Sequence, residues 1–118
     1  MIRRFEDLTV WKEAMNLAFE IYKSINSLND FVLKQQILRA AISIPSNVAE
    51  GFDRQTNKEF IQYLHIAKGS CAELRTQLYL LKKLEFMDVG FMESSIEKTK
   101  KISAMLYNLI KTRKEKFK

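Results

Sequence analysis

The chain has 118 residues, of which 47% are hydrophobic and 29% are charged, and its formal net charge is +6. This length fits a single domain with one core, spanning residues 1–118. Three glycines and one proline are too few for a fold rich in turns, so the composition favours helices. One cysteine and one histidine exclude an internal disulfide and a Cys/His zinc site, and we expect no metal or other cofactor.

The longest uncharged stretch, residues 40–49, is too short to cross a bilayer and is interrupted by polar residues and a proline. The N-terminal segment lacks the apolar run of a secretory signal. We therefore expect a cytoplasmic protein without membrane contact. The positive charge favours anionic partners such as nucleic acid through long-range attraction.

The first predicted helix begins after Asp7, which we expect to act as its N-cap. Apolar residues then recur at alternating spacings of three and four, which is typical of a helix with one buried face. The polar cluster at residues 26–30 ends this helix and supplies a cap for the next one. The buried face is predicted to contain Trp11, Ala14, Ala18, Ile21, Ile25 and Leu28.

The second predicted helix runs from about Phe31 to Phe52. Pro45 lies inside its apolar pattern, and proline both removes a backbone donor and clashes with the preceding turn. We expect a kink near Ala41 to Pro45, or two helices that meet there. Gly51 and the polar residues after it are expected to stop the helix.

The third predicted helix opens at Thr56, because Thr56 and Glu59 have the spacing of a capping box, and it continues to about Leu84. The fourth runs from near Asp88 into the lysine-rich tail. Short connections between four amphipathic helices favour an all-α, antiparallel, up-down-up-down four-helix bundle.

No catalytic centre is evident in the sequence. His65 is the one residue that titrates near neutral pH without special tuning, and Cys71, six positions away, projects from a different face of the same helix. Cys71 also lies on the apolar seam, where a thiol behaves as a small inert hydrophobe. We therefore expect a protein that is not an enzyme, and we rank an activity based on His65 or Glu50 at a subunit interface last.

Polar residues form one stripe along the second predicted helix and another along the third. Water-facing surface is the ordinary interpretation of such stripes. Two features favour contact with a partner or a neighbouring subunit instead: the stripes contain few lysines, and Gly69 inside a helix costs about 1 kcal/mol relative to alanine. The candidate interface residues are Gln36, Arg39, Ser43, Asn47, Glu50, Gly69, Ser70 and Glu73.

Several motifs make the sequence recognisable: FEDLTVWKEA at 5–14, QILRAAISIPSNVAEG at 36–51, KEF at 58–60 and AKGS at 67–70. The chain resembles the bacterial four-helix-bundle proteins encoded within 23S ribosomal RNA intervening sequences. The resemblance implies a non-enzymatic protomer that assembles into a ring-like homopentamer with a positively charged surface or channel. A more distant similarity is to the accessory protein of diversity-generating retroelements, whose pentamer engages a reverse transcriptase and nucleic acid.

Two hypotheses for function follow. The first is a homo-oligomer whose basic side chains contact RNA or DNA phosphates with little reading of bases. The second is a protein-interaction scaffold that docks a partner enzyme and has no direct role with nucleic acid. For the first hypothesis the candidate contacts are Arg3, Arg4, Lys98, Lys101, Lys111, Arg113, Lys114 and Lys116.

Overall fold

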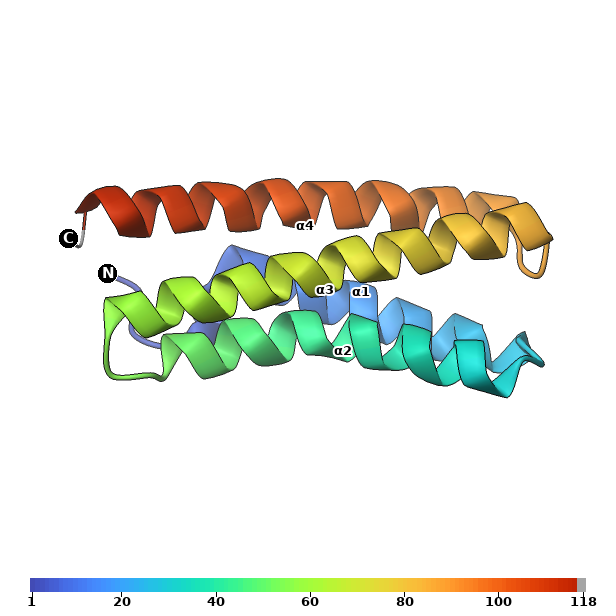
Figure 1. Cartoon of the computed structure of the whole chain (residues 1–118), viewed down its shortest axis with the longest axis horizontal. Helices are drawn as coiled ribbons and strands as arrows, with labels where there is room; N and C mark the ends of the chain where they lie inside the picture. The colour runs from blue at the N-terminus through green and yellow to red at the C-terminus, as the bar shows by residue number, and fades with distance from the viewer. Residues whose placement is uncertain (117–118) are drawn as a thin grey trace.

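The computed structural model describes residues 1–116 and consists almost entirely of helices. Four long helices follow one another: α1 (Thr9–Ser24), α2 (Phe31–Phe52), α3 (Asn57–Leu84) and α4 (Val89–Lys116). Two short 3₁₀ helices, η1 (Phe5–Asp7) and η2 (Ile25–Ser27), flank α1. Consecutive long helices are joined at alternating ends, and the described chain starts and finishes at the same end of the molecule (Figure 1). The fold is the predicted all-α four-helix bundle.

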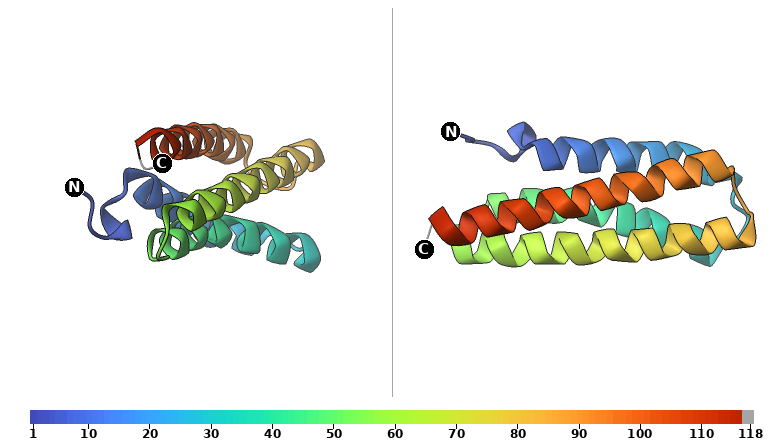
Figure 2. Two further views of the ribbon diagram at one scale, coloured as in Figure 1. Left: turned by 60° about the vertical axis from the view of Figure 1, so that its left-hand side comes forward. Right: turned by 90° about the horizontal axis from the view of Figure 1, so that it is seen from above.

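All four long helices contribute to one hydrophobic core. Leu17, Ile44, Leu64 and Leu106 come from different helices, and each is at most 1% exposed. Burying a side chain of this size stabilises a fold by roughly 1.5–3 kcal/mol. The helices run side by side in a bundle about 46 Å long, and α3 packs along both α2 and α4 (Figure 2). No helix among the described residues combines the length and apolar character that a membrane-spanning segment needs.

The starts of α2, α3 and α4 are set by side chains that accept backbone hydrogen bonds. Asp30 Oδ1 accepts from the Leu33 amide at 3.0 Å, and Thr56 Oγ1 accepts from the Glu59 amide at 3.1 Å. Asp88 Oδ2 accepts from the Phe91 amide at 2.9 Å. These contacts satisfy amides that have no partner inside the helix, and they confirm the three predicted helix starts.

The predicted N-cap of α1 is wrong. Residues Phe5–Asp7 form η1, in which the Leu8 amide donates to the Phe5 carbonyl at 3.0 Å, so α1 starts at Thr9 with Leu8 in the cap position. The Asp7 carboxylate instead lies 3.4 Å from Arg4 Nε. At its other end α1 stops at Ser24, and the buried Leu28 of the predicted seam lies beyond η2.

Pro45 does not divide the second helical segment. α2 is continuous through this position, so the expectation of two separate helices is wrong. α2 ends at Phe52, as predicted, but Gly51 lies inside its last turn without a positive φ and therefore does not cap it. A methyl group at Gly51 would lie 2.5 Å from Tyr63 Cβ, far inside van der Waals contact. Glycine is therefore needed here because α2 and α3 approach closely.

We predict that Gly51→Ala lowers the free energy of unfolding by roughly 1–3 kcal/mol, because the added methyl forces α2 and α3 apart. Ser46→Ala, at an exposed position of the same helix, is the control, and it should leave stability within about 0.5 kcal/mol. Urea denaturation followed by circular dichroism measures both. Equal stability of Gly51→Ala and the unmodified chain would contradict the close approach of the two helices.

Candidate nucleic-acid and subunit interfaces

Two of the predicted phosphate contacts, Lys98 and Lys101, lie on the side of α4 that faces α1. Lys98 Nζ is 2.7 Å from Glu20 Oε1, and Lys101 Nζ is 2.9 Å from Glu13 Oε1. Both carboxylates belong to α1. Because each lysine is next to an opposite charge, this side of the molecule presents little net positive potential to a phosphate.

The remaining predicted cations differ in how they are engaged. Arg4 is paired locally with Asp7, as described above. Arg113 holds α3 and α4 together at the end of the bundle. Four others have no ion pair within residues 1–116, and these are Arg3, Lys111, Lys114 and Lys116.

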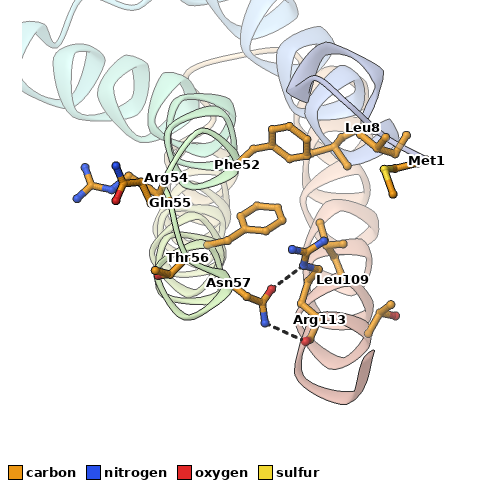
Figure 3. Close-up of a pocket in the computed structure, with 12 residues that line it drawn as sticks. Met1, Leu8, Phe52, Arg54, Gln55, Thr56, Asn57, Leu109 and Arg113 are labelled. Atoms are coloured by element: carbon orange, nitrogen blue, oxygen red, sulfur yellow. Dashed lines mark hydrogen bonds between the residues drawn. The ribbon is translucent and has the colours of Figure 1, made fainter. Parts of the chain in front are cut away.

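Arg113 has a structural environment. Its Nε donates to Asn57 Oδ1 at 2.7 Å, and Asn57 Nδ2 donates to the Arg113 carbonyl at 3.1 Å (Figure 3). The guanidinium also lies over the Phe60 ring, 5.0 Å from its centroid. Burial lowers the pKa of the Arg113 guanidinium from its usual value. A cavity of about 460 Å³ lies beside these residues, with Leu8 and Phe52 in its largely apolar wall.

Five basic residues line a surface between α3 and α4. Two adjoining hollows, of about 390 and 400 Å³, share Lys68 and Tyr107 in their walls. We call them together the α3/α4 groove. It is lined by Lys68, Arg75, Lys100, Lys111 and Lys114, together with His65, Ser103, Tyr107, Asn108 and Glu115.

The structure therefore unites Lys111 and Lys114 with three cations that the sequence analysis did not select, Lys68, Arg75 and Lys100. The spacing of these residues in the sequence could have indicated a shared basic surface. Lys100, Lys111 and Lys114 have spacings of eleven and three, which place them on one side of a helix, and Lys68 and Arg75 are seven apart on the preceding helix.

Partly buried hydrogen bonds fix Arg75 in the wall of the groove. Arg75 Nε donates to Thr99 Oγ1 at 3.0 Å and Nη2 donates to the Thr99 carbonyl at 3.3 Å. The same carbonyl accepts from Cys71 Sγ at 3.0 Å. Cys71 is fully buried, and burial raises the pKa of its thiol, as expected for the predicted core thiol.

Carboxylates offset part of the charge in the groove. Lys100 Nζ lies 3.3 Å from Glu97 Oε1, and the hydrogen bond between them raises the pKa of Lys100. Glu115 belongs to the wall of the hollow that contains Lys111 and Lys114. The side chains of Lys100 and Glu97 are both well exposed, so a phosphate can replace this contact at a small cost in free energy.

The predicted polar stripes of the second and third helices lie together on one surface, the α2/α3 stripe, which consists of the eight candidate interface residues given above. In its middle, Ser43 Oγ and Ser70 Oγ are 2.8 Å apart. Asn47 Nδ2 donates to Ser43 Oγ at 2.9 Å and to the Ser43 carbonyl at 2.8 Å. These three partly buried side chains therefore join α2 to α3 within the chain.

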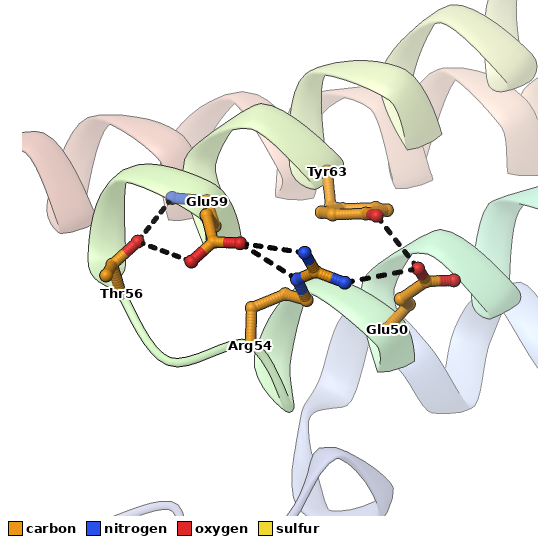
Figure 4. A network of polar contacts seen from close by, with 5 residues as sticks. All are labelled: Glu50, Arg54, Thr56, Glu59 and Tyr63. Atoms are coloured by element: carbon orange, nitrogen blue, oxygen red, sulfur yellow. Dashed lines mark hydrogen bonds and ion pairs between the residues drawn. The ribbon is translucent and has the colours of Figure 1, made fainter.

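Near the α2–α3 turn, Glu50 belongs to an exposed polar network (Figure 4). Tyr63 donates its hydroxyl to Glu50 Oε2 at 2.8 Å, and this bond raises the pKa of Tyr63. Arg54 lies 2.9 Å from Glu59 and 3.9 Å from Glu50. Hydrogen bonds from Thr56 and then Arg54 lower the pKa of the Glu59 carboxyl. Glu50 is thus engaged in holding the turn.

The other half of the α2/α3 stripe is open. Gln36, Arg39 and Glu73 border an exposed hollow of about 620 Å³. Arg39 and Glu73 have no ion pair within the described residues 1–116. A methyl group at Gly69 would meet no atom within 4 Å, so nothing in this chain requires a glycine there. Ile42, which lines this hollow, is 38% exposed, and Ile66 of α3 is 48% exposed.

The α3/α4 groove and the α2/α3 stripe occupy different sides of α3. At about 100° per residue, Lys68 projects roughly 140° and Arg75 roughly 160° away from Glu73. The buried seam of α3, which includes Leu64 and Cys71, occupies the remaining side. One face can therefore contact another subunit while the other stays accessible.

His65 lies exposed in the wall of the α3/α4 groove. Within residues 1–116 it makes no hydrogen bond or ion pair that would orient its ring for proton transfer. The described residues also contain no group of three or more His, Cys, Asp or Glu side chains suited to holding a metal ion.

Comparison with known proteins identifies the family. The family model for the 23S rRNA-intervening sequence protein matches residues 6–108. A solved structure, of a protein of unknown function from the S23 ribosomal protein family of Bacteroides thetaiotaomicron, is 29% identical and superposes with a TM-score of 0.82, covering 87% of this chain and 99% of that one. No curated protein matches the sequence. The chain belongs to the 23S rRNA-intervening sequence protein family.

Proposed function

We propose that this protein is a non-enzymatic homo-oligomer that binds RNA or DNA by the phosphate backbone along the α3/α4 groove. The observation that carries the proposal is the convergence of five cations from two helices on one groove. Among the described residues, Glu97 pairs with Lys100 and Glu115 shares the wall with Lys111 and Lys114, which leaves an excess of three positive charges over these two carboxylates. Such a surface neutralises several phosphates and releases their counterions, which gives affinity without sequence specificity.

The α2/α3 stripe is the proposed subunit interface. Its open half combines exposed Ile42 with two charges, Arg39 and Glu73, that have no ion pair among the described residues. Gly69 lets a neighbouring helix approach the backbone of α3, and this approach would offset the cost of a glycine in a helix. An assembly of five subunits is the expectation that follows from the family resemblance.

Three observations support a role that does not involve catalysis. Cys71, the single thiol, is fully buried. Glu50 is engaged with Tyr63 and Arg54. His65 has no orienting partner within residues 1–116, whereas a general base needs one to act efficiently. We therefore expect His65→Ala to change neither nucleic-acid binding nor any other activity of the protein.

The open half of the stripe also supports the second hypothesis, a scaffold for another protein, because an exposed isoleucine, Ile42, in the wall of a hollow suits a protein surface. A pull-down with and without nuclease distinguishes the two functions. A partner protein that is retained after nuclease treatment and lost in Ile42→Glu would favour the scaffold. A partner released by nuclease would favour binding through nucleic acid.

We predict that replacing Lys68, Lys111 and Lys114 together with glutamine weakens binding to RNA and flattens its dependence on salt. Fluorescence anisotropy of labelled RNA at roughly 50 and 200 mM salt measures both quantities. Each lost contact with a single strand lowers the slope of log K against log salt by about 0.7, so the triple variant should lose about 2.

The matched control is Lys12, Lys98 and Lys101 replaced by glutamine, which removes the same charge away from the groove. It should change the salt slope by much less, because two of its lysines are already paired with α1 carboxylates. Equal losses in the two triple variants would show that only overall charge matters and would refute the groove.

We predict that Gly69→Leu dissociates the oligomer, because a bulky side chain blocks close approach to the α3 backbone. Leucine favours a helix over glycine by roughly 0.8 kcal/mol, so the loss of assembly cannot come from a weaker helix. Sedimentation velocity gives the oligomeric state. Ala72→Leu, an exposed position of α3 on the groove side, is the control and should assemble normally. An intact oligomer in Gly69→Leu would exclude this interface.

A further inference from the structure

An exposed aromatic ring lies at the centre of the α3/α4 groove. Tyr107 is 58% exposed and belongs to the walls of both hollows, as does Lys68. Lys111 and Lys114 lie on one side of it along α4, and Lys100 lies on the other. This ring is only partly covered by its own chain, so one face of it stays available to a ligand among the cations.

A second tyrosine extends the same pattern. Tyr79 of α3 is 46% exposed and contributes, after Glu97, to raising the pKa of Lys100, which places its hydroxyl near that ammonium group. Exposed rings and cations are therefore neighbours here, with Tyr107 between Lys111 and Lys100 in the groove and Tyr79 close to Lys100. From Lys100 to Lys114 the groove follows α4 for about 21 Å, at 1.5 Å per residue.

Neighbouring cations and exposed rings fit an unpaired strand better than a duplex. In a duplex the faces of the bases are covered by their neighbours in the stack, so a tyrosine ring has no base face to contact. In a single strand the bases are free to stack on aromatic side chains while the phosphates follow a basic groove. Stacking also tolerates any sequence, because every base has a face that can stack on a ring.

We infer that the α3/α4 groove takes a single-stranded segment of nucleic acid, with a base stacked on Tyr107 and phosphates on the lysines around it. The inference rests on the proposed function and specifies its substrate class. Tyr107 then contributes affinity for unpaired strands alone, while Lys68, Lys111 and Lys114 contribute affinity for any polyanion.

The test compares Tyr107→Leu and Tyr107→Phe with the unmodified protein. Leucine keeps apolar bulk and helix propensity at this exposed position but removes the ring, and phenylalanine keeps the ring. The probes are an unstructured RNA of about 12 nucleotides, a DNA strand of the same sequence, and the duplex of that DNA. Anisotropy titrations at roughly 50 and 200 mM salt give the affinity of each protein variant for each probe and the dependence of that affinity on salt.

We expect Tyr107→Leu to lower affinity for the single strands roughly tenfold and to leave duplex affinity unchanged. Its salt slope should equal that of the unmodified protein, because no charge is removed. Tyr107→Phe should restore single-strand binding. Tighter binding of the RNA than of the DNA strand would show that the groove prefers ribose, and equal affinity would show that it accepts either sugar. Both results agree with stacking.

Other outcomes overturn the inference in distinguishable ways. If Tyr107→Leu binds single strands as tightly as the unmodified protein, or loses single-strand and duplex affinity equally, the base does not stack on Tyr107. Phosphate binding along the groove would survive that result, provided that the lysine variants still lower the salt slope. If the unmodified protein binds none of the probes at the lower salt, the proposed function itself fails.

Discussion

Both candidate surfaces depend on one constraint, the fixed orientation of α3 about its own axis. Leu64, Ala67, Cys71, Leu74 and Leu78 form its buried seam, each at most 1% exposed, and turning the helix would expose several of them at roughly 1.5–3 kcal/mol each. With the seam fixed against the core, Lys68 and Arg75 have to project toward α4. Gly69 and Glu73 have to project on the other side, next to α2.

The contacts between neighbouring helices complete this arrangement. Gly51 lets α2 approach α3, which brings Ser43 within 2.8 Å of Ser70 and makes one continuous stripe from two helices. On the other side Thr99 of α4 accepts hydrogen bonds from Cys71 and Arg75, and it thereby fixes a groove cation to the core. The same packing that stabilises the bundle thus sets the spacing of the groups available to a partner.

Much of this fold was predictable from the sequence, because helical periodicity and capping are local. Asp30 and Thr56 cap helices where the pattern placed them, whereas Asp7 does not, since a 3₁₀ turn comes first. The groove was less predictable. Whether a lysine meets a carboxylate depends on which helix lies beside it, so Lys98 and Lys111 look alike in sequence although only Lys98 is paired within the described residues. The need for glycine at Gly51 was missed for a similar reason, because its close contact with Tyr63 depends on how α3 packs beside α2.

Photo-crosslinking of a single-stranded RNA to the protein, followed by mass spectrometry, shows directly whether nucleic acid lies along the α3/α4 groove. RNA bound there should form adducts on peptides that contain Lys68, Tyr107 or Lys111, and none on peptides from α1. Adducts concentrated on α1, or spread evenly over every exposed lysine, would contradict binding along the groove.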